Sequence, residues 1–182
     1  MGLTNRNFTE ITQFNDLWTK NAWQAEVVNG KWSAEDFFAN QNKVSRDHAR
    51  MPIPWTSGRQ GGFTAGRPWF ALNDNFQDIN ADRAIRDPGS IYYYYRDLIA
   101  RRHKTPALIY GDYKDLAPDH PHVFTYERRL EDEAYLITLN FSPVENKVPL
   151  PPRLTAWLAG NYGPADIFDS LRPWEARIHR VS

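Results

Sequence analysis

The chain has 182 residues, and its 41% hydrophobic and 24% charged composition is ordinary for a globular protein that buries a core. Its 22 basic residues balance its 22 acidic residues, so no net field attracts nucleic acid or an anionic membrane surface. The absence of cysteine excludes disulfides, a thiolate nucleophile and cysteine-type zinc sites. No signal-peptide core and no run of about 18 apolar residues occurs. We therefore expect a soluble, cytoplasmic protein with no nucleic-acid or membrane partner.

Two helices are predicted after a polar, turn-like stretch over residues 1–14. Apolar residues recur at three- and four-residue steps over residues 15–28, and Gly30 follows as a stop signal. The four residues 33–36 have the form of a capping box, which predicts a second helix over residues 34–43. Both helices are expected to serve in packing.

A long stretch rich in glycine, proline, arginine and tryptophan follows over residues 44–69. Its glycines and prolines exclude a long helix or a central strand, so it is predicted to be loop. The large aromatic residues need a surface to pack on, which favours an ordered wall over disorder. Flat aromatic faces beside guanidinium forks and a carboxylate suit a sugar, which has apolar C–H faces and a rim of hydroxyls.

A purely structural alternative for this stretch remains open. The loop would then fold over a barrel edge with Trp55 and Trp69 as plugs. In that case Asp47 would form a surface pair with Arg46 or Arg50.

The clearest helix is predicted over residues 90–104. Ser90 caps its start, Pro106 prevents its continuation, and the basic residues at its end match the helix dipole. The apolar stripe consists of Ile91, Tyr94, Tyr95, Leu98 and Ile99. Only two of the four consecutive tyrosines can share a face, so core packing is expected rather than a stacking platform.

Beyond Pro106 the pattern changes to short runs rich in β-branched and aromatic residues, separated by turn residues. Strands are predicted over residues 107–113, 122–128, 134–141, 145–150 and 176–181. Residues 128–133 form the hairpin connection between the second and third strands. The pattern predicts a small antiparallel β-sandwich, so the whole chain is expected to be α+β.

The central stretch resembles a known family. The segment Arg46-Asp47-His48-Ala49-Arg50-Met51-Pro52, with Trp55 beyond it, is similar to the R-D-N-A-R-T-P-M-Q-W segment of α-glucosidases and oligo-1,6-glucosidases in glycoside hydrolase family 13. The likeness continues in order through Gly62-Phe63-Thr64, Gly66-Arg67-Pro68-Trp69, Ile79-Asn80, Ser90-Ile91-Tyr92-Tyr93-Tyr94-Tyr95, Tyr110-Gly111, Asn140-Phe141 and Leu171-Arg172-Pro173-Trp174-Glu175-Ala176. It covers nearly the whole chain.

The resemblance implies an architecture. Residues 2–5 match the segment that follows the eighth barrel strand in the family. Residues 1–104 are therefore expected to be the C-terminal part of the catalytic (β/α)8 barrel, and residues 105–182 the antiparallel β-sandwich domain that follows it. In the family, the nucleophile and the acid/base carboxylate of the retaining mechanism come from earlier barrel strands. We therefore expect no catalytic residue in this chain and no turnover by the isolated chain.

The full-length relative would cleave α-glucosidic bonds of short oligosaccharides, and sucrose isomerases and trehalose-6-phosphate hydrolases share these motifs. The first arginine of the family segment helps to hold the non-reducing-end glucose, a role that carries over to Arg46. Arg50 is expected to pin the loop or flank the next subsite. The remaining substrate-binding residues expected are Trp55, Phe63 and Trp69. A loop-locking ion pair is the structural alternative for Arg46.

Several departures and alternatives stay open. Met51, Ile53 and Pro54 replace threonine, methionine and glutamine of the family, so any preference beyond the first subsite is in doubt. Residues 119–122 contain two histidines without a third ligand nearby and are predicted to be a solvated turn, so neither a metal nor a cofactor is expected.

An oligosaccharide is the expected partner in the full-length context. An incomplete barrel should also expose apolar surface on residues 14–43 and on the stripe that begins at Ile91, which favours self-association or a complementary barrel fragment. Two other classes remain: a non-catalytic sugar-binding module, and an interaction protein similar to the amino-acid-transporter heavy chains.

Overall fold

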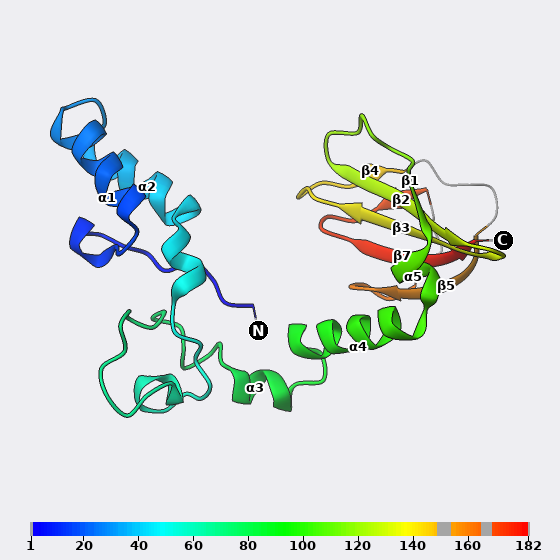
Figure 1. Cartoon of the computed structure of the whole chain (residues 1–182), viewed down its shortest axis with the longest axis horizontal. Helices are drawn as coiled ribbons and strands as arrows, with labels where there is room; N and C mark the ends of the chain where they lie inside the picture. Colours follow the sequence, from blue (N-terminus) through cyan, green and yellow to red (C-terminus); the bar gives the residue numbers. More distant parts are fainter. Residues whose placement is uncertain (1, 149–153, 165–168, 182) are drawn as a thin grey trace. The chain divides into compact units, whose positions relative to one another are not determined.

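The computed structural model describes residues 2–148, 154–164 and 169–181 (Figure 1). Two compact units make up the chain, residues 1–93 and 94–182. The domain boundary expected between residues 104 and 105 is the end of the barrel, which division into compact units does not test. That boundary remains a prediction. Across the described residues, no helix combines the length and the apolar character that a membrane span needs.

The first unit begins with the two predicted helical regions, which the structure confirms. The first comprises α1 (Leu17–Ala22) and a π-helical continuation, η2 (Trp23–Val28). Gly30 follows it with a left-handed φ of 74°, as a stop signal should. The second is α2 (Ala34–Val44), where the Ser33 hydroxyl accepts a hydrogen bond from the Asp36 N–H at 3.0 Å.

The core of this unit is aromatic and draws on residues 1–14, which had been predicted to be a turn-like stretch with only scattered apolar residues. Phe8 and Phe14 are fully buried there, with ring centroids 4.5 Å apart, and pack with Met51 and Phe70. The segment contains only the short 3-10 helix η1 (Ile11–Gln13). Its few apolar residues follow no period, so their burial was missed.

The central stretch contains no long helix and no strand, as predicted, but it includes two short 3-10 helices, η3 (Arg46–Arg50) and η4 (Arg59–Gly62). The Trp55 N–H donates to the Gly61 carbonyl at 2.7 Å and closes a turn. Gly61 has φ 60°, and a Cβ there would lie 2.5 Å from a Leu72 methyl carbon, so the turn requires glycine. Backbone bonds then tie the stretch to α3 (Ala81–Arg86).

The predicted helix over residues 90–104 is present as α4 (Ile91–Lys104), but none of its residues is buried. The expectation of core-packed tyrosines is therefore wrong, because the apolar stripe divides between two faces. Tyr94 and Leu98 are half-buried, whereas Ile91, Tyr95 and Ile99 are exposed. The expected exposure of apolar surface from Ile91 onward is confirmed, and residues 14–43 likewise expose Leu17, Trp18 and Val28.

The strand predicted over residues 107–113 is wrong in its first part. Residues 106–110 form a short helix, α5 (Pro106–Tyr110), with proline in its first turn. Proline has no N–H to lose there and its φ suits a helix, so it stops α4 and starts α5. Ala107 is fully buried and packs with Tyr135 and Ile137 of the sheet.

The second unit contains two antiparallel sheets, as predicted, and the fold is α+β (Figure 1). The larger sheet has the order β1-β2-β3-β7-β5, with bounds Asp112–Asp115, Val123–Leu130, Glu133–Asn140, Ala176–Val181 and Leu154–Gly160. The smaller sheet pairs β4 (Asn146–Lys147) with β6 (Ser170–Leu171). Val123, Val148 and Leu171 form a buried cluster that packs the two sheets together.

Most strand predictions are confirmed, including the hairpin, whose strands close at the Leu130–Glu133 pair. Strands β5 and β6 were not predicted, because Ala, Leu and Gly in β5 have weak β-propensity and β6 has two residues. Residues 149 and 150 of the strand expected over 145–150 lie outside the described residues.

A buried carboxylate organises the loop before β7. Glu175 is 1% exposed, and its carboxylate accepts hydrogen bonds from the guanidinium groups of Arg172 and Arg177 at 2.8–3.2 Å and from the Arg172 N–H at 2.7 Å. Burial alone would raise the pKa of Glu175, but the hydrogen bonds from Arg177 and Arg172 outweigh it and lower the pKa from 4.5 to about 2.

The Glu175→Gln substitution should destabilise the protein by roughly 3 kcal/mol at neutral pH, because it removes the buried carboxylate that pairs with buried Arg177 and with Arg172. Since the pKa of Glu175 is lowered on folding, its stabilising contribution is present above the unfolded pKa of 4.5 and is lost as the pH falls toward 2. Denaturant titrations between these pH values should therefore show a smaller pH dependence for the variant. Glu145→Gln, at an exposed loop position, is the matched control. Equal pH dependence in wild type and Glu175→Gln would contradict the assignment.

Candidate functional site

Two buried carboxylates hold two exposed guanidinium groups at the start of the central stretch. Asp16 Oδ1 accepts hydrogen bonds from Arg46 Nη2 at 2.8 Å and from Arg50 Nη1 at 3.3 Å. Asp47 Oδ1 lies 3.5 Å from the same nitrogen of Arg50. The carboxylate side chains are 3% and 0% exposed, whereas those of Arg46 and Arg50 are 63% and 50% exposed. The buried carboxylates therefore orient the exposed guanidinium groups.

Asp47 is a structural residue that joins the central stretch to α1. Its Oδ2 accepts hydrogen bonds from the backbone N–H groups of Asn15 and Asp16 at 2.7 and 2.8 Å. The Arg50–Asp47 pair of the structural alternative is present, but Asp47 is fully buried, so it is not a surface pair. Arg46 pairs with Asp16 and not with Asp47.

Asp16 combines two roles, since it also caps α1. Its Oδ2 accepts hydrogen bonds from the Thr19 N–H and hydroxyl at 3.3 and 3.2 Å. Burial alone would raise the pKa of Asp16, but the hydrogen bonds from Arg46 and Thr19 outweigh burial and lower it below 3.8. The cluster formed by Asp16, Asp47, Arg46 and Arg50 thus pairs two carboxylates with two guanidinium groups.

The aromatic candidates form a separate group. Phe63 is half-buried and meets Trp69 edge to face, with ring centroids 5.1 Å apart. Trp69 is 67% exposed and Trp55 is 51% exposed. No hydrogen bond, ion pair or ring contact in the described part of the chain joins these three residues to Arg46 or Arg50. The structure thus unites the arginines through Asp16 and unites Phe63 with Trp69, and substrate binding by all five residues stays a prediction.

Sequence reasoning overlooked Asp16 as a partner of the arginines. A usable signal was present, because Asp16 directly precedes the first apolar residue of the predicted helix, a preferred N-cap position. What it did not reveal was the approach of Arg46, which is 30 positions away along the chain.

The arrangement supplies hydrogen-bond donors and charge, but no nucleophile. A guanidinium fixed on one side by a carboxylate retains further N–H groups for hydroxyl oxygens, and exposed indoles offer flat apolar faces.

The two histidines of residues 119–122 belong to a turn. His120 Nδ1 accepts hydrogen bonds from the His122 and Val123 N–H groups at 3.2 and 2.9 Å and so closes that turn. No group of three metal-ligating side chains occurs within residues 2–148, 154–164 and 169–181.

Residues 2–111 match the family model described as the catalytic domain of alpha-amylase. The chain belongs to the α-amylase family. It is 36% identical over 182 residues to an oligo-1,6-glucosidase of Heyndrickxia coagulans, an alignment that covers 98% of this chain and 32% of that protein. A trehalose-6-phosphate hydrolase of Escherichia coli is 34% identical, with 97% of this chain and 33% of the relative covered.

Solved structures of the family agree. The trehalulose synthase MutB of Pseudomonas mesoacidophila MX-45 superposes with a TM-score of 0.88 at 37% identity, covering 100% of this chain and 34% of the synthase. The chain therefore spans about a third of the length of the relatives it matches. The catalytic-domain match ends at residue 111, one position before β1, so a barrel portion is followed by antiparallel sheets.

Replacement of Asp47 by alanine should lower the free energy of unfolding of the first unit by about 2–3 kcal/mol, because the buried N–H group of Asp16 and the part-buried N–H group of Asn15 lose their acceptor. Amide exchange at Asn15 and Asp16 should accelerate in the same variant, and hydrogen exchange followed by NMR reads both effects. Asp78→Ala is the matched control, since the Asp78 side chain is 75% exposed and pairs only with exposed Arg83. A loss of stability no larger than that of the control would show that Asp47 does not join these segments.

Proposed function

We propose that this chain is the C-terminal part of an α-glucosidase-like O-glycosyl hydrolase that acts on α-glucosidic bonds of short oligosaccharides. Within that enzyme, Arg46 contributes to the subsite that holds the terminal glucose. Membership of the α-amylase family and the likeness to an oligo-1,6-glucosidase and a trehalose-6-phosphate hydrolase support this proposal.

The observation that carries the proposal is the contrast in exposure between Arg46 and its partner. Asp16 is almost fully buried and binds one nitrogen of the Arg46 guanidinium at 2.8 Å, yet the Arg46 side chain is 63% exposed. An arginine that served only to lock the loop would gain by burying its remaining N–H groups in hydrogen bonds. A planar fork fixed by a carboxylate on one edge can instead present its other edge to a sugar hydroxyl.

The two arginines differ in a way that assigns them separate roles. Arg46 contacts one carboxylate, whereas Arg50 lies between Asp16 and Asp47 at 3.3 and 3.5 Å. Arg50 is therefore proposed mainly to pin the loop, and Arg46 mainly to bind substrate. Structures of two trehalulose synthase mutants are complexes with sucrose and with glucose, which supports glucose as the sugar unit bound near Arg46.

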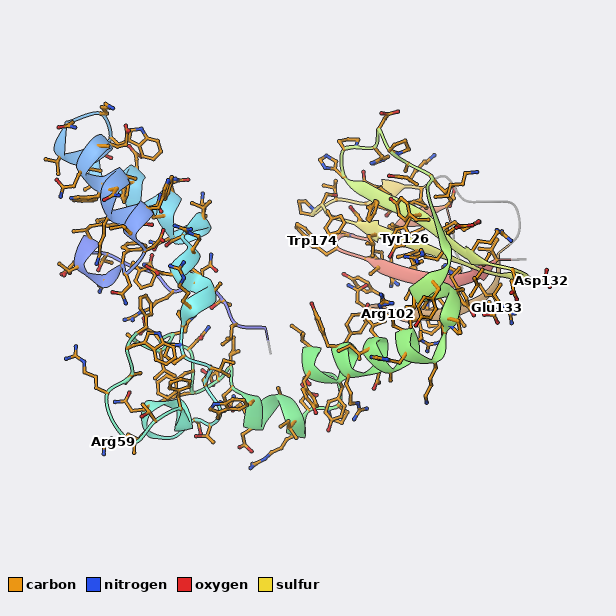
Figure 2. The ribbon with its side chains drawn as sticks, in the orientation of Figure 1. Arg59, Arg102, Tyr126, Asp132, Glu133 and Trp174 are labelled. Atoms are coloured by element: carbon orange, nitrogen blue, oxygen red, sulfur yellow. The ribbon has the colours of Figure 1, made fainter. Side chains whose placement is uncertain are left out.

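A chimera tests the role of Arg46, with this chain in place of the corresponding third of the Heyndrickxia coagulans oligo-1,6-glucosidase. Hydrolysis of 4-nitrophenyl α-glucoside by the chimera should fall roughly 10- to 100-fold in kcat/KM on Arg46→Lys, because a charge-assisted hydrogen bond contributes about 1.5–3 kcal/mol. Arg59→Lys in the glycine-rich turn should leave the rate unchanged; Arg59 is exposed and lies in the first unit (Figure 2). Equal rates for the Arg46→Lys and Arg59→Lys chimeras would refute substrate binding by Arg46.

The isolated chain is proposed to have no turnover, because the family's catalytic carboxylates come from earlier barrel strands. The same nitrophenyl assay on the 182-residue chain should give the background rate. A rate above background that disappears on Arg46→Ala would overturn this proposal.

A non-catalytic sugar-binding module is the second candidate, and the exposed indoles of Trp55 and Trp69 favour it. Calorimetry with soluble glucan should then give saturable binding that Trp69→Ala weakens. If the wild-type chain gives no heat of binding with soluble glucan, this candidate function is excluded.

Self-association or binding to a complementary barrel fragment is also proposed. It is supported by the exposed apolar residues Leu17, Trp18, Val28, Ile91 and Ile99. Sedimentation velocity should therefore show oligomers, and a hydrophobic dye should bind the chain. A chain that sediments only as a monomer and binds no dye would argue against this proposal.

A further inference from the structure

The second unit contains a cavity of about 390 Å³ that the proposed glucosidase function does not use. Residues from α4, α5, β2, β3 and β7 surround it, all within residues 94–182. Its apolar wall consists of Leu98, Leu108, Ile137, Leu139 and Ile178. Tyr94 and Tyr126 add two aromatic rings. This volume lies at the small end of the range of about 300–1,000 Å³ for ligand sites, so a small molecule fits it better than a chain segment.

The charged residues that line this cavity are all arginines. Arg101, Arg102, Arg128 and Arg177 contribute, and no aspartate or glutamate does. Arg177 is neutralised by buried Glu175 at 2.8 Å. The other three form no ion pair with any residue of the described ranges. Three positive charges therefore face a half-apolar cavity without a counter-ion.

Backbone carbonyls orient two of these guanidinium groups. Arg102 Nη1 donates to the Leu108 carbonyl at 3.0 Å, and Arg128 Nη2 donates to the carbonyls of Ile109 and Gly111 at 3.1 and 2.7 Å. Each bond uses one terminal nitrogen, so each group keeps further donors, and the buried Nε of Arg128 has no partner. The Arg101 side chain makes no hydrogen bond within the described residues. The side chains are positioned, but their charge is not compensated.

Two of these arginines lie near Tyr126, a residue whose pKa is raised overall. Burial raises the pKa of the Tyr126 phenol, whereas the positive charges of Arg128 and Arg102 lower it. Arg102 comes from α4 and Tyr126 from β2, and Figure 2 labels both. Exposed Arg102 and half-buried Arg128 thus lie near one half-buried aromatic ring, where an anion would gain more than in water.

We propose that this cavity binds a small organic anion with an aromatic body, of the aryl carboxylate class. The carboxylate would accept hydrogen bonds from Arg101, Arg102 and Arg128, and the ring would lie on the aliphatic wall and against Tyr126. A bare inorganic anion leaves the apolar wall unfilled, and a neutral aryl alcohol leaves the charges uncompensated. The site is distinct from the Arg46 region and does not depend on the proposed glucosidase function.

Fluorine NMR of 4-fluorobenzoate, added to the full chain, tests this proposal. We expect a saturable change of the ligand signal that weakens as salt is added, because screening reduces the attraction of the arginines. Arg101→Gln should weaken binding about tenfold, since it removes one charge-assisted contact and no hydrogen bond of the fold. Arg128→Gln is less suitable, because Arg128 also holds two backbone carbonyls.

The control variant is Arg129→Gln. Arg129 lies on β2 next to Arg128, but it is exposed and pairs with Glu127 at 2.9 Å, so this variant should bind 4-fluorobenzoate like wild type. Two control ligands complete the design: 4-fluorobenzyl alcohol should show no saturable change, and inorganic phosphate should not displace 4-fluorobenzoate. No saturable signal with wild type, equal affinity for Arg101→Gln and Arg129→Gln, or equal binding of the alcohol would overturn the proposal. Displacement by phosphate at equal concentration would overturn the aromatic part of it.

Discussion

The central stretch depends on one buried acid, Asp47. Its carboxylate accepts hydrogen bonds from two backbone N–H groups at the start of α1 and lies near Arg50, so the glycine- and proline-rich segment is tied to the helical core at that point. The same contact places Asp16 beside Arg46, because Asp16 contributes one of the two N–H groups. The orientation of the candidate sugar-binding arginine therefore follows from a backbone contact that involves no substrate.

The second unit uses a similar interaction for a different purpose. Glu175 is buried between Arg172 and Arg177 and holds the turn before β7. Arg177 is itself buried, whereas Arg172 is 43% exposed and Arg46 and Arg50 remain half to largely exposed. The buried Arg177–Glu175 pair is a structural lock, and a buried carboxylate with an exposed guanidinium group makes an oriented surface donor. The two clusters have similar composition and differ in the burial of one arginine, Arg177.

The family relationship concerns about a third of each relative. The match to the catalytic-domain model ends where the first strand begins, so that model covers the helical part of the chain and not the antiparallel sheets. The exposed apolar side chains of α1, η2 and α4 are consistent with a proposed larger assembly, since such surface in water has a free-energy cost that burial removes.

The amino-acid sequence alone determined the family, the two N-terminal helical regions, α4 and the β2–β3 hairpin, because capping residues, apolar periodicity and turn residues are local signals. It could not show that Phe8 and Phe14 form the core, since their partners are distant in the chain. Nor did it show that residues 106–110 are helical, because proline can end one helix and begin another. Only the tertiary structure decided which acid holds Arg46 and which arginines share a cavity, since both depend on contacts between segments that no local pattern specifies.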